Sequence, residues 1–172
     1  MNEIDDINVL KYVIFTLRNF SLKSEFKELI EPENALFEII LSTLFSNKDI
    51  EIKYELSWVL INVTFYSNKF HSKLLRKDIL ESLFEMTFEK KLLIHSLWIF
   101  NNIISNEKIT LKTVISGLPE YKSRIIHLMK TINSYEVKSQ LVESLLTLAE
   151  NVKKHSKLLK VFLCIHRYSI LN

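Results

Sequence analysis

A tryptophan followed four positions later by an asparagine occurs twice in this chain, at a separation of forty residues. The first pair is Trp58 and Asn62, and the second is Trp98 and Asn102. Alignment of the chain on these pairs reveals four copies of an apolar stripe spaced i, i+4, i+7, i+8 and i+11, which follows one side of an amphipathic helix. The copies are Val9, Val13, Thr16, Leu17 and Phe20; Ile52, Leu56, Val59, Leu60 and Val63; Leu92, Ser96, Ile99, Phe100 and Ile103; and Val137, Leu141, Ser144, Leu145 and Leu148. The sequence therefore predicts a repeat in which each unit buries its apolar side only against its neighbours.

The composition indicates an all-α protein. The 172 residues include one glycine and two prolines, whereas average usage is about 7% and 5% and strand-rich folds need many turn residues. The apolar fraction of 48% is sufficient for a continuous core. We therefore expect a single domain in which nearly the whole chain is helical.

Each interval between two stripes holds a short and a medium helix, separated by a helix breaker. The expected helices are 23–30, 35–46, 68–76, 79–87, 107–116 and 119–132, with breaks at Pro32, at Asp78, which is expected to cap the following helix, and at Gly117. Three helices per unit, at a period of about 40 residues, is typical of an armadillo repeat rather than of the two-helix HEAT plan. The sequence thus predicts an armadillo right-handed α–α superhelix with a partial unit at 1–22, units at 23–66, 67–106 and 107–151, and a closing helix at 152–172.

The two Trp/Asn pairs also resemble a known family. Residues 55–64 and 95–104 are similar to the third helix of the armadillo units of importin-α (karyopherin-α), where such pairs form a groove that receives nuclear localisation signals. The resemblance implies an adaptor for nuclear protein import that binds an extended, basic peptide segment of a cargo protein. The peptide-binding residues that it implies are Trp58, Asn62, Trp98 and Asn102 and, at the matching positions of the first copy, Phe15 and Asn19.

The geometry of such a groove follows from helix spacing. Residues four apart lie on one helix face, so each tryptophan lies beside its asparagine. Equivalent helices stand about 8–10 Å apart and an extended peptide advances about 3.3–3.6 Å per residue, so each unit spans roughly three ligand residues. We expect parallel indole planes to hold the aliphatic stems of lysine or arginine, and the asparagine amides to bind the peptide backbone. The alternative is that the tryptophans belong to the core, where the asparagine beside each of them would need a partner.

Three features depart from the family's pattern. The fourth copy has Glu143 and Thr147 in place of the pair, so the ladder ends or changes there. The acidic side chains that importin-α often places four residues after the asparagine are absent, and Glu51, Glu55 and Glu107 are the nearest substitutes. The start of the chain is acidic and does not match the basic N-terminal segment by which the family binds importin-β, which leaves open whether a transport receptor of that kind binds.

Two other functions stay open. A general armadillo scaffold would bind a partner segment that is not basic, in keeping with the net charge of +3. A nucleic-acid-associated repeat protein would use the C-terminal Lys153, Lys154, Lys157 and Lys160 and is the less favoured of the two. The chain has no glycine-rich phosphate loop and no zinc-binding spacing of His and Cys, so we expect neither an enzyme nor a bound cofactor or metal.

The sequence also predicts where the protein resides. Its acidic start does not have the pattern of a signal peptide, and no apolar run comes near the ~18 residues of a membrane span. The one cysteine, Cys164, has no partner for an internal disulfide and is expected to be buried and inert. These features predict a protein of the cytoplasm and nucleus that does not enter a membrane.

Overall fold

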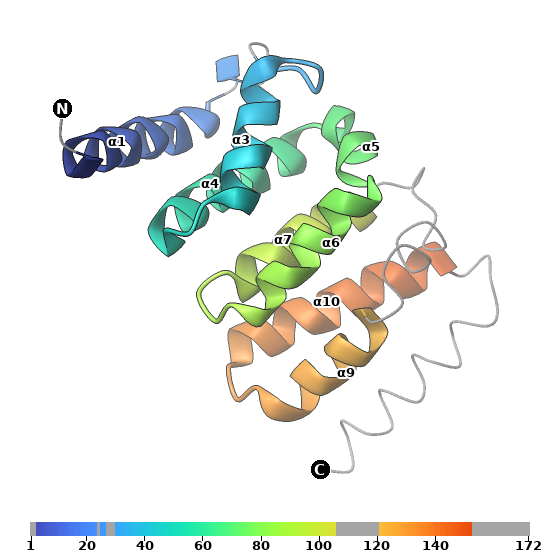
Figure 1. Ribbon diagram of the computed structural model, residues 1–172. Helices are drawn as coiled ribbons and strands as arrows, with labels where there is room; N and C mark the ends of the chain where they lie inside the picture. Colours follow the sequence, from blue (N-terminus) through green and yellow to red (C-terminus); the bar gives the residue numbers. More distant parts are fainter. Residues whose placement is uncertain (1–2, 24, 27–29, 106–120, 153–172) are drawn as a thin grey trace.

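The computed structural model describes residues 3–23, 25–26, 30–105 and 121–152 (Figure 1). The elements are α1 (Glu3–Ser21), α3 (Ala35–Ser46), α4 (Ile50–Tyr66), η1 (Asn68–Phe70), α5 (His71–Leu74), α6 (Lys77–Glu85), η2 (Met86–Phe88), α7 (Leu93–Ile104), α9 (Tyr121–Thr131) and α10 (Tyr135–Val152). Every element in these ranges is a helix, which confirms the all-α prediction. Within the same ranges, no helix is long and apolar enough to cross a membrane.

Four of the helices form a row in which each packs on the next. The order is α1, α4, α7 and α10, which runs from blue to orange in Figure 1. The shorter helices make a second layer, with α3 against α4 and α9 against α10. In the middle of this layer, the Ser96 hydroxyl of α7 donates to the Leu83 carbonyl of α6 over 2.6 Å. Each copy of the sequence stripe therefore falls on one helix of the row, with Leu92 at the N-cap position just before α7. The unit boundaries inferred from the repeat stay a prediction.

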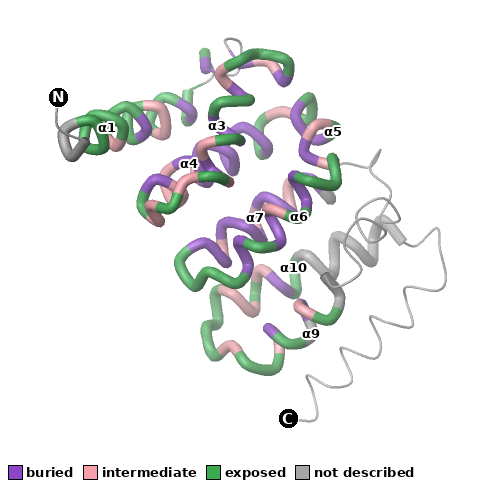
Figure 2. Tube along the Cα trace, in the orientation of Figure 1, coloured by how far each residue is buried: buried purple, intermediate pink, exposed green. Residues whose placement is uncertain are grey.

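The apolar stripes of α4 and α7 form the centre of the core. All five stripe residues of the second copy are at most 3% exposed, and all five of the third copy are fully buried. They pack in one cluster with residues of the second layer, such as Phe37 of α3 and Leu83 of α6. The first stripe differs, because Val9 and Val13 of α1 are more than half exposed. Most of α1 is coloured as exposed in Figure 2. No helix in the described part of the chain covers that side of α1.

Capping side chains explain where the helices of the second repeat begin. The Asn34 side chain accepts a hydrogen bond of 2.9 Å from the Leu36 backbone N–H at the start of α3, and Asp49 accepts one of 2.8 Å from the Glu51 N–H at the start of α4. The prediction that Asp78 caps the next helix is wrong. Since α6 begins at Lys77, Asp78 lies inside its first turn, where a negative charge is favoured by the helix dipole. There it binds the guanidinium of Arg76 over 2.6 Å.

The core description is tested by Leu60→Ala in α4. Leu60 is fully buried, so removing three carbon atoms should lower the free energy of unfolding by about 2–5 kcal/mol. Urea denaturation followed by circular dichroism measures this change. The matched control is Ile39→Ala in α3, where the side chain is 59% exposed and the expected change is within about 0.5 kcal/mol. Equal effects of the two substitutions would contradict the assignment of the core.

Candidate functional site

The six residues of the predicted groove lie on three neighbouring helices of the row. They are Phe15 and Asn19 on α1, Trp58 and Asn62 on α4, and Trp98 and Asn102 on α7. The two residues on α1 are exposed, whereas those on α4 and α7 are buried or half-buried. The structure therefore brings together the two Trp/Asn pairs and leaves the first position of the ladder open to solvent.

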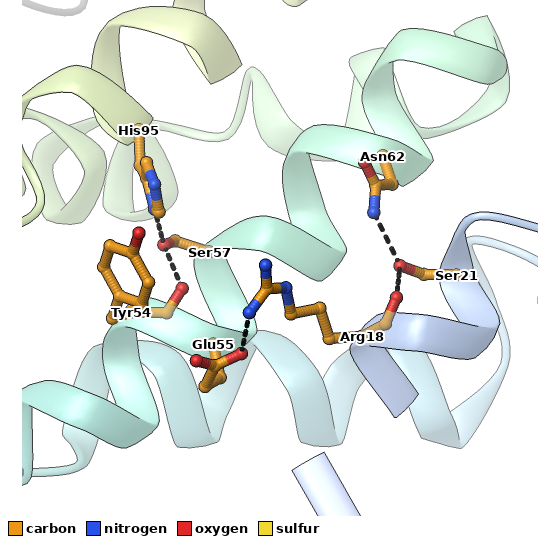
Figure 3. A network of polar contacts seen from close by, with 7 residues as sticks. All are labelled: Arg18, Ser21, Tyr54, Glu55, Ser57, Asn62 and His95. Carbon is orange, nitrogen blue, oxygen red and sulfur yellow. Dashed lines mark hydrogen bonds and ion pairs between the residues drawn. The ribbon is translucent and has the colours of Figure 1, made fainter. Parts of the chain in front are cut away.

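Both asparagines of the pairs bind the preceding helix of the row. The Asn62 amide of α4 donates to the Ser21 hydroxyl of α1 over 2.8 Å (Figure 3). The Asn102 amide of α7 donates to the Thr64 hydroxyl of α4 over 3.0 Å and to the Ile61 carbonyl over 3.2 Å. An asparagine amide nitrogen carries two hydrogens, and those of Asn102 are both used in this contact. In place of the expected bonds to a peptide backbone, these donors join one helix to the next.

The two hydroxyl acceptors occupy equivalent positions in the repeat. Ser21 follows Asn19 by two residues, and Thr64 follows Asn62 by two residues. Each hydroxyl also donates to a carbonyl of its own helix: Ser21 to that of Arg18 over 2.6 Å, and Thr64 to that of a residue four positions earlier over 2.8 Å. The pattern Asn-x-Ser/Thr therefore supplies both the acceptor for the following helix and the donor for the preceding one.

The pattern stops after α7. The position two residues after Asn102 is Ile104, and the fourth copy has Thr147 where an asparagine donor would lie. In place of this bond, the Asn101 amide of α7 donates to the Gln140 side chain of α10 over 3.2 Å. Acceptor and donor are thus lost together at this contact. The change from a hydroxyl residue to Ile104 and from asparagine to Thr147 is visible in the sequence. An alignment on the tryptophans alone does not show that the two changes belong to one contact.

The tryptophans form a closed aromatic cluster rather than a ladder. The ring centroids of Trp58 and Trp98 are 5.3 Å apart with planes inclined by 61°, so the prediction of parallel indole planes with a slot between them is wrong. The physical reason is His95, whose ring stacks at 15° on Trp98 and makes an edge contact with Trp58 at 4.7 Å. Edge contacts of this kind are favoured by the ring quadrupoles.

His95 is held by a short chain of hydrogen bonds. The Ser57 hydroxyl donates to the Tyr54 carbonyl over 2.7 Å, and its oxygen lies 2.5 Å from His95 Nδ1 (Figure 3). Because a serine hydroxyl has one hydrogen, this arrangement assigns a hydrogen to His95 Nδ1 as the donor of the second bond. Burial, with the positive charge of Arg18 as a second cause, lowers the pKa of His95 to about 4. The imidazole is therefore neutral at physiological pH.

One face of the cluster holds a cation from α1. The Arg18 guanidinium binds the Glu55 carboxylate over 2.9 Å (Figure 3). It also lies 5.3 Å from the centre of the Trp58 ring. Glu55 and Trp58 are three residues apart on α4 and so share a helix face. The Trp58 Nε1–H is the one buried side-chain polar group without a hydrogen-bond partner in the described part of the chain.

A second cation is held in the same way one turn earlier on α4. The Lys91 ammonium group, from the turn before α7, binds the Glu51 carboxylate and lies 5.2 Å from the centre of the Tyr54 ring. Glu51 and Tyr54 are also three residues apart. Both Glu-x-x-aromatic couples of α4 thus hold a cation from another part of this chain, and the residues Tyr54, Arg18 and Lys91 were not among the predicted site residues. The available signal was the repeated Glu-x-x-aromatic spacing.

A hollow of about 340 Å³ lies beside these couples, between α1 and α4. It is lined by Lys11, Tyr12, Ile14, Phe15, Glu51, Ile52 and Glu55. The structure therefore places Phe15, the first position of the predicted ladder, next to two of the predicted acidic contacts. The surface of this hollow is almost entirely apolar and its lining includes the cationic Lys11, so it suits the aliphatic or aromatic part of a ligand side chain rather than its charged end.

Several predicted residues lie outside the described part of the chain. They are Glu107, Gly117, Cys164 and the basic residues Lys153, Lys154, Lys157 and Lys160. Glu143 is exposed on α10, and the side chain of Thr147 is not described. Among the described residues, no three His, Cys, Asp or Glu side chains are grouped so as to hold a metal ion.

The inter-helix role of the asparagines is tested by Asn62→Ala. Loss of the buried amide removes the donor that binds the Ser21 hydroxyl. The free energy of unfolding should fall by about 1–3 kcal/mol. Asn19→Ala is the matched control, because Asn19 occupies the same repeat position but is exposed, and its expected effect is within about 0.5 kcal/mol. A double-mutant cycle with Ser21→Ala should give a coupling energy of at least about 0.5 kcal/mol, and additive effects would exclude the bond as a stabilising contact.

The buried histidines predict a loss of stability in mild acid. The folded-state pKa values of His95 and His71 lie below the ordinary value of 6.5, both mainly because of burial. The unfolded chain therefore binds protons at a higher pH than the folded chain does. The contribution of the two neutral histidines to the free energy of unfolding should be fully present above pH 6.5 and should be lost as the pH falls towards 4. The part due to His95 is on the order of 3 kcal/mol. Thermal unfolding at a series of pH values measures it. His95→Gln should reduce the slope, the exposed His127→Gln should not, and equal slopes in all three proteins would contradict the assignment.

Comparison with protein-family models, with curated proteins and with solved structures gives no match to this chain. The resemblance of the Trp/Asn segments to importin-α consequently rests on those segments alone. Any function must be argued from the arrangement of α1, α4 and α7 described above.

Proposed function

We propose that this chain is an armadillo-type peptide-binding adaptor of the kind that importin-α represents, acting in nuclear protein import in the cytoplasm and nucleus. Its ligand is an extended basic segment of another protein, bound along the face that α1 and α4 form. The hollow beside Phe15, Glu51 and Glu55 has room for the apolar part of a ligand side chain. A transport receptor as a second partner is part of the same proposal.

The observation that carries this proposal is the pair of cation sites on α4. An aromatic ring with a carboxylate three residues away binds a lysine or arginine by a cation–π contact and an ion pair, worth together about 0.5–2 kcal/mol at a partly exposed site. In this chain, Arg18 and Lys91 occupy the two sites. The same chemistry in a ligand would therefore be recognised by Glu55 with Trp58 and by Glu51 with Tyr54.

The resident cations set the expected strength of binding. A basic ligand has to share or replace the ion pairs of Arg18 and Lys91, of which the Lys91 pair is about half exposed. Surface ion pairs of this kind contribute at most about 1 kcal/mol, so displacement is energetically accessible. We expect a dissociation constant of roughly 10–100 µM for a short peptide, because several weak contacts must offset the cost of ordering it.

A general scaffold for a non-basic partner is the second candidate. It is supported by the ion pairs that already neutralise Glu51 and Glu55, and by an apolar pair at the end of α4. Phe65 and Tyr66 are 69% and 46% exposed and lie in edge contact at 5.0 Å. Large exposed aromatic side chains are typical of surfaces that bind other proteins. Binding of nucleic acid by the C-terminal lysines stays the third alternative.

The test is a titration with a fluorescent peptide that contains a run of lysine and arginine residues. Glu55→Gln keeps the size of the side chain and removes its charge, so it should weaken binding roughly two- to tenfold. Arg18→Gln should strengthen binding by a similar factor, because it removes the resident cation from the Glu55 and Trp58 site. Fluorescence anisotropy at low salt measures all three proteins, and circular dichroism verifies that the variants are folded.

Two controls make the result specific. Glu81→Gln removes an exposed acid of α6, distant in sequence from the site, and should leave the affinity unchanged. A peptide with glutamine at every basic position should not bind if the proposal is correct. Absence of binding by the parent protein at about 100 µM, or equal affinities for Glu55→Gln and the parent, would refute the adaptor. Tighter binding of the uncharged peptide would favour the general scaffold.

A further inference from the structure

The two cation sites of α4 follow one another along the same helix. The first is the couple of Glu51 and Tyr54, and the second is the couple of Glu55 and Trp58. Residues four apart on a helix lie on one face, with about 5–6 Å between their Cβ atoms. The two couples therefore form a strip of four side chains that runs lengthwise along α4 rather than across the row of helices.

The neighbouring copies of the repeat do not extend this strip to other helices. Where α4 has its two glutamates, the first copy has Asn8 and Tyr12. The third copy has Lys91 and His95 at these positions. A ligand that crossed the row from helix to helix, as expected for the predicted groove, would therefore meet the carboxylates of α4 only. The positions of the acids favour a ligand that lies along α4.

Side chains of α1 and α7 border the strip on its two sides. On the α1 side, the Arg18 guanidinium binds Glu55 over 2.9 Å. On the α7 side, the ring of Trp98 contacts that of Trp58, with centroids 5.3 Å apart. A single line of exposed or half-buried α4 side chains lies between these borders. A second helix is about 10–12 Å in diameter and needs a wider surface, whereas one extended segment fits such a line.

The resident cations reach the strip from two separate elements. Arg18 comes from α1, and Lys91 comes from the turn before α7. The side chains of Lys91 and Glu51 are 42% and 53% exposed, so this ion pair is the more accessible of the two. A ligand with both cations on one chain has an advantage over them, because binding of the first raises the effective concentration of the second. The advantage requires a spacing that matches the strip.

We propose that the ligand is an extended segment with lysine or arginine at alternate positions, bound lengthwise along α4. Successive side chains of an extended chain point to opposite sides, so residues i and i+2 face the same way. They are about 6.6–7.2 Å apart, which is close to the separation of the two couples, since helical side chains diverge outwards. One basic residue binds Glu51 and Tyr54, and the other binds Glu55 and Trp58. This assignment rests on the proposed function and specifies the ligand that it recognises.

The apolar hollow beside the strip suits the same ligand. Glu51 and Glu55 belong to its lining, together with Ile52 of α4 and Phe15 of α1. Lysine and arginine bury their aliphatic stems against apolar surface while the charged end stays at a polar partner. The stems of the two basic residues therefore lie against the hollow while their charged ends meet the carboxylates at its edge.

The first test compares two fluorescent peptides of equal composition and charge. One alternates lysine and serine, in the order Lys-Ser-Lys-Ser-Lys-Ser-Lys. The other has the order Lys-Lys-Ser-Ser-Lys-Lys-Ser, which contains no two lysines at i and i+2. Fluorescence anisotropy at low salt should show about three- to tenfold tighter binding of the alternating peptide. Equal affinities, or tighter binding of the paired peptide, would overturn the lengthwise assignment. So would failure of the alternating peptide to bind where a continuous run of lysines binds.

The second test asks whether both couples are used at once. Glu51→Gln and Glu55→Gln should each weaken the alternating peptide about three- to tenfold, to the level of the paired peptide. Each should weaken the paired peptide by less than about twofold, because that peptide engages one couple at a time and keeps the other available. Glu81→Gln, an exposed acid of α6, should change neither affinity. Circular dichroism verifies that the variants are folded. Equal losses for the two peptides would refute simultaneous use of the couples.

Failure of this assignment can be told apart from failure of the adaptor. If no lysine peptide binds the parent protein at about 100 µM, the adaptor is refuted and this assignment with it. If the alternating and paired peptides bind equally, and both are weakened by Glu55→Gln, the adaptor stands and the lengthwise ligand is wrong.

Discussion

Two hydrogen bonds between side chains, from Asn62 to Ser21 and from Asn102 to Thr64, determine how three successive helices of the row are placed. Apolar surfaces alone allow packed helices to slide by a turn at modest cost, because ridges and grooves repeat along the helix. A buried amide that loses its partner costs about 1–3 kcal/mol, so the placement in which both amides are bonded is favoured over a shifted one. That placement brings Arg18 to Glu55 and Trp58, and His95 to Ser57. Both the aromatic cluster and the cation sites depend on it.

The distribution of these bonds explains why equivalent asparagines differ. Asn62 and Asn102 have a helix before them with a hydroxyl at the right position, whereas Asn19 lies on the first helix described and is exposed to solvent. Beyond α7, the acceptor position is Ile104 and the contact with α10 uses Asn101 and Gln140 instead. The repeat position is therefore the same in each copy, but the role of the residue is set by its neighbour. A side chain without such a neighbour is left free for solvent or for another molecule.

Much of the fold could be predicted from the sequence, because the period of the apolar stripe and the scarcity of glycine reflect local physics. The predicted helix at 35–46 coincides with α3, and the stripes of α4 and α7 are buried as expected. The site was harder to predict. The angle between Trp58 and Trp98 depends on His95, and the use of Glu55 depends on Arg18, which is 37 residues away in the chain. Such contacts are set by packing between helices, which no single segment of sequence encodes.

If the cation sites of α4 bind a ligand as proposed, they would couple that binding to stability. Arg18 joins α1 to α4 through Glu55 and at the same time covers one face of Trp58. A ligand that displaces Arg18 gains its own cation–π contact but removes part of the contact between two helices. The bond from Asn62 to Ser21 lies three residues further along α1 and involves the backbone carbonyl of Arg18 through Ser21, but not its guanidinium. Because this bond does not use the guanidinium, it should keep the helices in place if a ligand's cation were to replace that of Arg18.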